Sequence, residues 1–192
     1  MNQARKIVSK HLSGRKVLVL FVLTNMVYLL MIFMTIPKVM AFSGDLKLLD
    51  MMPLGYDLDY VNALFSALGE KGRDTYLYSQ IPVDMIYPFL FGLTYSLIFA
   101  YFLDKLGKLD SVFIYAGLLP LMAGTADYLE NMGIVLMLAN FPDVSKGLAG
   151  ITNVFSMVKS AATTVYFILL ILLMLWLGIK TLGELRRGVR SK

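Results

Sequence analysis

Residues Ser160–Ile179 read SAATTVYFILLILLMLWLGI, and they hold no charged side chain between Lys159 and Lys180. A helix needs about 20 residues to cross the ~30 Å hydrocarbon core of a bilayer, so this stretch is long enough to span it. Its apolar residues do not alternate with polar ones, as they would in a strand. Because the bilayer core offers no water to unpaired backbone groups, the stretch predicts a transmembrane helix.

Three further stretches have the same character. Val17–Pro37 and Met85–Leu103 hold no charged residue, and Ser111–Pro142 holds only Asp127 and Glu130. Hydrophobic residues make up 58% of the 192 residues and charged residues 16%, a balance typical of a polytopic membrane protein. We predict an all-α membrane protein whose single domain, residues 1–192, is a four-transmembrane-helix bundle with spans at about 17–37, 79–103, 111–139 and 153–179.

The loop between the first two spans contains a further helical pattern. In residues 57–69, apolar side chains recur at positions 58, 61, 64, 65 and 68. Asp57 is suited to the N-cap of a helix and Gly69 to its C-terminal end. We predict an extra amphipathic helix at about 57–69 in the first extracytoplasmic loop, lying on the membrane surface or over the mouth of the bundle.

Prolines mark where the predicted spans end or bend. Pro37 predicts the end of the first span, because proline cannot continue the backbone hydrogen-bond ladder. Pro82 and Pro88 each remove one helical hydrogen bond. The start of the second span is therefore expected to kink and to free carbonyl groups near Asp84.

Lysine and arginine are distributed unevenly over the two sides of the predicted bundle. Residues 1–16 hold five of them, the loop 104–111 holds two and the tail 180–192 holds five, whereas the opposite side holds six. Short cytoplasmic flanks carry the excess of these residues in membrane proteins. We therefore predict a bacterial inner (plasma) membrane protein with both termini in the cytoplasm. The net charge of +5 follows from this topology and from attraction to anionic lipid, and it implies no nucleic-acid partner.

The start of the chain also imitates a cleavable signal peptide, with a basic segment, an apolar run and the residues Val39-Met40-Ala41. The apolar run 17–37 is longer than the ~7–15 residues usual in such peptides. This length favours an uncleaved first span.

Two carboxylates and an amide interrupt the third span in the run AGTADYLENMGIVLML. Asp127, Glu130 and Asn131 are three and four residues apart, and they project from one face of a helix. Asp84 lies at a similar predicted depth in the second span. Ionisable groups within a bilayer are costly and usually face a bundle interior or a water-filled cavity, so these four residues are predicted to form a ligand or ion site.

The last span supplies a base for this cluster. Lys159 belongs to a polar stripe whose members recur at helical spacing, and we predict that it acts as the counter-ion of the carboxylates or as an anion anchor. The stripe and the polar or aromatic residues of the other spans make up the predicted pocket lining, which comprises Asn25, Tyr28, Tyr87, Tyr128, Ser156, Thr163 and Tyr166.

Three acids against one lysine leave surplus negative charge in this layer. We expect that one carboxyl group, Glu130 or Asp127, keeps its proton, or that a cation occupies the pocket. The alternative is a buried polar network that only fixes the register of the helices, with Lys159 extending outward to water.

We predict an outward-opening intramembrane polar pocket that binds a cation, a proton, or the headgroup of a lipid or other small amphipathic molecule, as a transporter or carrier does. Four helices without an internal repeat are few for transport, which favours a homo-oligomer. Two alternatives stay open. One is an intramembrane lipid-modifying enzyme that uses the carboxylates as acid and base, with catalytic residues that no motif identifies. The other is a structural or assembly subunit of a larger membrane complex.

No cofactor or metal is predicted. The chain has no cysteine, and its single histidine, His11, lies in the basic segment before the first span. Cysteine ligation of a metal is therefore excluded, as is histidine ligation of a metal or haem within the membrane. The methionines, which include Met31 and Met34 at helical spacing, are interpreted as apolar filling rather than copper ligands.

Overall fold

The computed structural model describes residues 13–190, with side chains described through residue 184. Within that range the chain is helical and contains no strand. Four helical stretches of the described chain are long and apolar enough to cross a membrane, namely Gly14–Met40, Leu58–Leu106, Val112–Asn140 and Lys146–Glu184. The predicted all-α class, with four helical stretches able to span a membrane, is confirmed for the described residues.

The first two spans are each assembled from shorter helices. The first consists of α2 (Gly14–Leu30), a π-helical turn η1 (Met31–Thr35) and α3 (Ile36–Met40). In the second stretch, α4 (Leu58–Thr75) and a π-helical turn η3 (Tyr76–Gln80) precede α5 (Ile81–Asp84) and α6 (Tyr87–Leu106).

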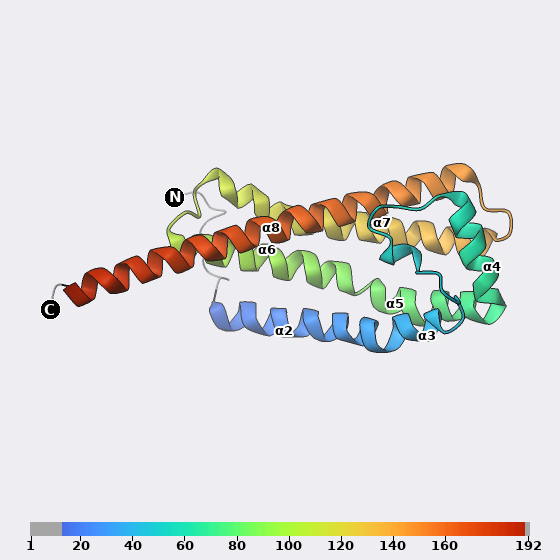
Figure 1. Cartoon of the computed structure of the whole chain (residues 1–192), viewed down its shortest axis with the longest axis horizontal. Helices are drawn as coiled ribbons and strands as arrows, with labels where there is room; N and C mark the ends of the chain where they lie inside the picture. Colours follow the sequence, from blue (N-terminus) through green and yellow to red (C-terminus); the bar gives the residue numbers. More distant parts are fainter. Residues whose placement is uncertain (1–12, 191–192) are drawn as a thin grey trace.

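The last two spans are α7 (Leu119–Asn140), which follows a 3-10 segment at Val112–Leu118, and the long helix α8 (Lys146–Arg190). Figure 1 shows that α2 begins and α8 ends at the same end of the bundle, which we call the terminal end. The opposite end carries α4, the loop before it and the turn between α7 and α8, and we call it the loop end.

Two hydrophobic cores lie one after the other along the bundle. The core nearer the terminal end includes Phe91, Leu103 and Tyr166, and the core at the loop end includes Phe65 and Ile134. Asp84 at the end of α5, Asp127 and Glu130 on α7, and Lys159 on α8 each fall between residues of their span that belong to the two cores. The predicted polar cluster is therefore a layer that separates two apolar regions.

Glycine allows α6 and α7 to approach closely beside this layer. A Cβ atom on Gly124 would lie 2.7 Å from the backbone oxygen of Pro88, and one on Gly92 would lie 3.3 Å from the backbone oxygen of Pro120. Side chains at either position would separate the two helix backbones. The close approach holds the start of α6 against the carboxylate-bearing face of α7.

Proline positions explain the irregular helices, and they correct one prediction. The first span does not end at Pro37 but continues through α3 to Met40. The π-helical turn η1 precedes Pro37, and its last bond joins the amide of Ile36 to the carbonyl of Met31, which widens the helix before the proline ring. The turn η3 stands in the same relation to Pro82.

The second span breaks where the prolines predict a kink. Helix α5 ends at Asp84, and α6 begins at Tyr87 with Pro88 in its first turn. Pro88 has no N–H to donate to the carbonyl of Asp84 four residues earlier. The side chain of Asn131 donates to that carbonyl oxygen instead, at 3.4 Å.

The long loop after the first span folds onto the loop end. Helix α4 begins where Asp57 accepts a hydrogen bond from the amide of Tyr60 at 2.8 Å. Its residues Val61, Leu64 and Phe65 are fully buried in the core of the loop end. The helical path is interrupted at Gly69, whose φ of 59° is accessible to glycine, and then resumes to Thr75.

Candidate ligand-binding site

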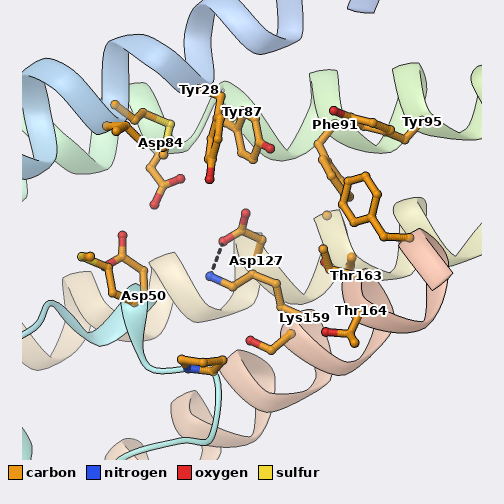
Figure 2. A pocket seen from close by; sticks show the side chains of 18 of the residues that line it. Tyr28, Asp50, Asp84, Tyr87, Phe91, Tyr95, Asp127, Lys159, Thr163 and Thr164 are labelled. Atoms are coloured by element: carbon orange, nitrogen blue, oxygen red, sulfur yellow. Dashed lines mark hydrogen bonds and ion pairs between the residues drawn. The ribbon is translucent and has the colours of Figure 1, made fainter. Parts of the chain in front are cut away.

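A cavity of about 590 Å³ lies within the polar layer and extends toward the terminal end. Its lining comes from all four spans and from the first loop, with Tyr28 from α2, Tyr87 from α6, Asp127 from α7 and Thr163 from α8 among the contributors. Figure 2 shows these side chains around the open space. The volume is within the ~300–1,000 Å³ range of small-molecule sites.

Lys159 binds two carboxylates of α7. Its Nζ atom lies 3.1 Å from Oδ1 of Asp127 and 2.5 Å from Oε2 of Glu130. The lysine side chain is 17% exposed and that of Glu130 is fully buried. The i, i+3 spacing on α7 places both acids on the face that meets α8, so one lysine partly neutralises two buried charges.

Asp84 is the carboxylate of the layer that lacks a partner. The residue is 3% exposed, and its carboxylate makes no hydrogen bond or ion pair with any described residue, although its backbone oxygen accepts from Asn131. In Figure 2 the carboxylate points into the cavity, toward the space between Asp50 and Asp127. Lys159 is close enough to pair with both Asp127 and Glu130, and the expectation that one of these two acids keeps its proton stays a prediction.

The loop contributes a fourth acid that the sequence interpretation missed. Asp50, in the 3-10 turn Leu49–Met51, lines the cavity and accepts hydrogen bonds from Tyr76 at 3.2 Å and Gln80 at 3.4 Å. Burial raises the pKa of Asp50, and the positive charge of Lys159 and these two hydrogen bonds oppose the rise. A signal was present in the sequence, because apolar pairs flank Asp50 on both sides in LLDMM.

Beyond the charges, the cavity becomes aromatic toward the terminal end. Tyr28 and Tyr87 stack with their ring centroids 5.5 Å apart, and Phe91 packs on Tyr95 at 4.7 Å. Phe167 of α8 lines the same region and lies 5.4 Å from the Tyr95 ring. The α8 stripe supplies Thr163 on this side, and Thr164 beside it was not predicted.

The structure gathers most of the predicted site but not all of it. Asn25, Tyr28, Tyr87 and Thr163 line the cavity together with Asp84, Asp127 and Lys159. Two further members of the predicted cluster, Glu130 and Asn131, lie behind the cavity wall, where Glu130 Oε1 and Asn131 Oδ1 are buried without a hydrogen-bond partner among the described residues.

Three predicted lining residues lie elsewhere. Tyr128 is half-buried next to the charged face of α7 and does not reach the cavity. Ser156 is buried in the bundle nearly one turn beyond Lys159 toward the loop end. Tyr166 turns toward α6, where its hydroxyl donates to the backbone oxygen of Tyr95 at 2.7 Å. Helical spacing identified their approximate face, but packing between neighbouring helices decided which side chains line the cavity.

The fold and the site define a helical membrane protein with a polar cavity among its spans. Comparison of the chain with protein families, with curated proteins and with solved structures finds no match. Arguments about function therefore rest on the cavity itself.

Proposed function

We propose that the protein binds a small, positively charged ligand in this cavity, as a transporter or carrier does. The ligand would be a cation, a proton or the headgroup of a lipid or other amphipathic molecule. The observation that carries the proposal is the unpaired carboxylate of Asp84, which is 3% exposed and faces a cavity of about 590 Å³. An uncompensated buried charge is costly, and a bound positive charge would compensate it.

The charge balance around the cavity supports the same proposal. Asp50, Asp84, Asp127 and Glu130 surround Lys159, the one basic residue that lines the cavity within the described chain. A network serving only to fix helix register needs fewer charges and leaves none unpaired. A purely structural role explains the Lys159 ion pairs but not the position of Asp84.

The proposal includes an orientation in a bacterial inner membrane. With both termini in the cytoplasm, the loop end faces outward, and the cavity lies in the outer half of the bundle. Helix α4 would then be the extra helix of the first extracytoplasmic loop, covering the bundle mouth with Val61, Leu64 and Phe65 packed inward. The support is the excess of lysine and arginine at the chain ends.

Carbodiimide labelling tests this proposal on the full chain in lipid nanodiscs. A hydrophobic carbodiimide reacts with carboxylic acids in apolar surroundings, so we expect Asp84 to be modified and tetramethylammonium or sodium to protect it. Asp84→Asn should remove the modified peptide, whereas Asp74→Asn, at an exposed position of α4, should not. Labelling confined to loop acids such as Asp57 and Glu70 would contradict the proposal and leave the layer as a structural network.

A second candidate is a lipid-modifying enzyme, and one observation favours it. Asp127 is paired with Lys159, whereas Asp84 is unpaired on the same cavity, so two carboxyl groups occupy different electrostatic environments. Such a pair can divide the roles of base and acid. Turnover of extracted lipid by the purified protein, abolished by Asp127→Asn, would favour the enzyme over the carrier.

A further inference from the structure

The cavity has a polar end and an apolar end, and three helices share this gradient. From the loop end toward the terminal end, the second span presents Asp84 at the end of α5, then Tyr87 and Phe91 on α6. Helix α8 presents Lys159, then Thr163, then Phe167. On α7 the residues beyond Asp127 in the same direction are Gly124 and Ala123. Figure 2 shows Asp50 and Asp84 toward one side of the space and the rings of Phe91 and Tyr95 toward the other, with Tyr28 and Tyr87 between them.

The cavity is bordered by two helices that do not pack along each other. Among the described residues, α2 packs mainly on α6, and α8 packs mainly on α7. Figure 1 shows α2 and α8 on opposite sides of α6. Tyr28 on α2 and Phe167 on α8 both line the cavity, and they are 42% and 36% exposed. Their partial exposure indicates that the cavity reaches the surface of the bundle between α2 and α8, within stretches that are long and apolar enough to cross a membrane.

The polar end suits an organic cation better than a metal ion. Among the described residues, no three acidic or histidine side chains come together as a metal-binding group. Asp84 instead has the stacked rings of Tyr28 and Tyr87 as its neighbours in the cavity. A carboxylate beside electron-rich rings is an arrangement that binds amines and quaternary ammonium groups.

We propose that the ligand is a cationic amphiphile, an amine or quaternary ammonium with an apolar chain, which reaches the cavity from the bilayer between α2 and α8. Its charged group binds Asp84 beside Tyr87, and its chain lies along Phe91 and Phe167. This proposal rests on the proposed function and adds the chemical class of the ligand and its route.

Equilibrium binding of radiolabelled decyltrimethylammonium to the protein in nanodiscs tests the ligand class, with empty nanodiscs subtracted. We expect saturable binding of decyltrimethylammonium. Because tetramethylammonium lacks the apolar chain, it should displace the bound compound only at concentrations at least about tenfold higher than unlabelled decyltrimethylammonium requires. Decyl sulfate, which is negatively charged, should not displace it. Asp84→Asn should weaken binding about tenfold or more. Because the Asp84 carboxylate has no partner to lose, this isosteric variant should fold, and its thermal unfolding verifies that.

A pair of phenylalanine variants separates the cavity from partitioning into lipid. Phe91→Ala should remove most of the advantage of decyltrimethylammonium over tetramethylammonium. Phe89→Ala on the same helix, 63% exposed and outside the cavity, should leave that advantage intact. Equal losses in the two variants would overturn the assignment of the chain to the cavity.

The outcomes distinguish this inference from the proposed function. If tetramethylammonium binds as tightly as decyltrimethylammonium, the site binds a cation without using an apolar chain. The inference of an amphiphilic ligand then fails, and the proposed function stands. If neither ammonium compound binds while sodium protects Asp84 from carbodiimide, the inference again fails and the proposed function stands. Absence of both ammonium binding and Asp84 labelling overturns both.

The side opening can be tested separately, because the chain has no cysteine. Thr164→Cys places a single thiol at the opening, and Ile168→Cys places one on the same helix outside the cavity. A lipid-soluble maleimide should modify both thiols, and decyltrimethylammonium should slow only the reaction at position 164. Rapid modification at position 164 by a membrane-impermeant maleimide would show access from water and would overturn the lipid route.

Discussion

Lys159 organises the polar layer at the scale of single residues. Its two ion pairs differ, because the side chain of Glu130 is fully buried at 2.5 Å from Nζ, whereas that of Asp127 is 9% exposed at 3.1 Å and also lines the cavity. Removing one partner of a buried ion pair is strongly destabilising, since it leaves the other charge without compensation. The arrangement indicates that Glu130 holds Lys159 in place and that Asp127 is available to the cavity.

Substitutions of Lys159, Glu130 and Asp127 should therefore lower the free energy of unfolding by different amounts. Lys159→Met should lower the free energy of unfolding by about 3–5 kcal/mol, because it strands two carboxylates. Asp127→Asn should have a smaller effect than Glu130→Gln, since Glu130 still pairs with the lysine. Chemical unfolding in detergent measures these changes. In double-mutant cycles with Lys159→Met, the Glu130 coupling should exceed the Asp127 coupling, and additive losses would show that the pairs do not interact.

Asp50 should make stability depend on pH. Burial raises its pKa above the ordinary value of 3.8. At pH values between 3.8 and the folded pKa, the folded protein keeps the Asp50 proton whereas the unfolded chain has released it. The contribution of Asp50 to the free energy of unfolding is therefore fully present below pH 3.8 and is lost as pH rises through the folded pKa. We expect Asp50→Asn to gain stability relative to the unmodified protein as pH increases from about 4 to 7, measured by thermal unfolding. A constant difference across this range would contradict the shift.

At the scale of helices, departures from regular geometry position the site. The π-helical turns η1 and η3 each end two residues before a proline, and the side chains of Thr35 and Gln80 join them by a hydrogen bond. Gln80 also donates to Asp50, which links the first two spans to the loop. The break after Asp84 lets α6 begin with Pro88 against Gly124 of α7.

The contact between α6 and α7 can be tested at Gly124. Gly124→Ala places a Cβ atom 2.7 Å from the backbone oxygen of Pro88, so the helices must separate. We expect a loss of about 1–3 kcal/mol, measured as a lower unfolding temperature in detergent. Gly147→Ala is the matched control, because a Cβ atom at this position of α8 meets no atom within 4 Å. Equal stability of the two variants would show that the contact tolerates a side chain.

At the scale of the whole molecule, the two hydrophobic cores and the layer between them divide the bundle. The core at the loop end includes α4 and the first loop, so this end is built by the segment between the first two spans. The other core belongs to the spans themselves, with α6 at its centre. Segments far apart in sequence thus enclose the cavity, and its orientation in the membrane follows from the orientation of the bundle.

Reporter fusions test that orientation. Fusions after residues 16, 108 and 192 should be cytoplasmic, and fusions near residues 60 and 146 should be extracytoplasmic, because lysine and arginine are concentrated at the chain ends and in the loop 104–111. Activity of an extracytoplasmic reporter at residue 192 would reverse the orientation and would place the cavity in the inner half of the membrane.

Local pattern was sufficient for the class of protein and for part of the site. Apolar length identified the four spans, because the bilayer imposes a minimum length on any helix that crosses it. Helical spacing placed Asp127, Glu130 and Asn131 on one face, because three and four residues make about one turn. Prolines indicated the break near Asp84, because a missing N–H is a local property.

Tertiary structure decided which charges are paired and what encloses the cavity. The position of Asp50 at the cavity depends on how the first loop folds. The position of Asp84, which has no partner, depends on how closely α6 approaches α7. The separation of α2 from α8 depends on both helices packing against others. No window of sequence contains these relations, because they arise from contacts between residues tens of positions apart, whereas span length and helical spacing are properties of neighbouring residues.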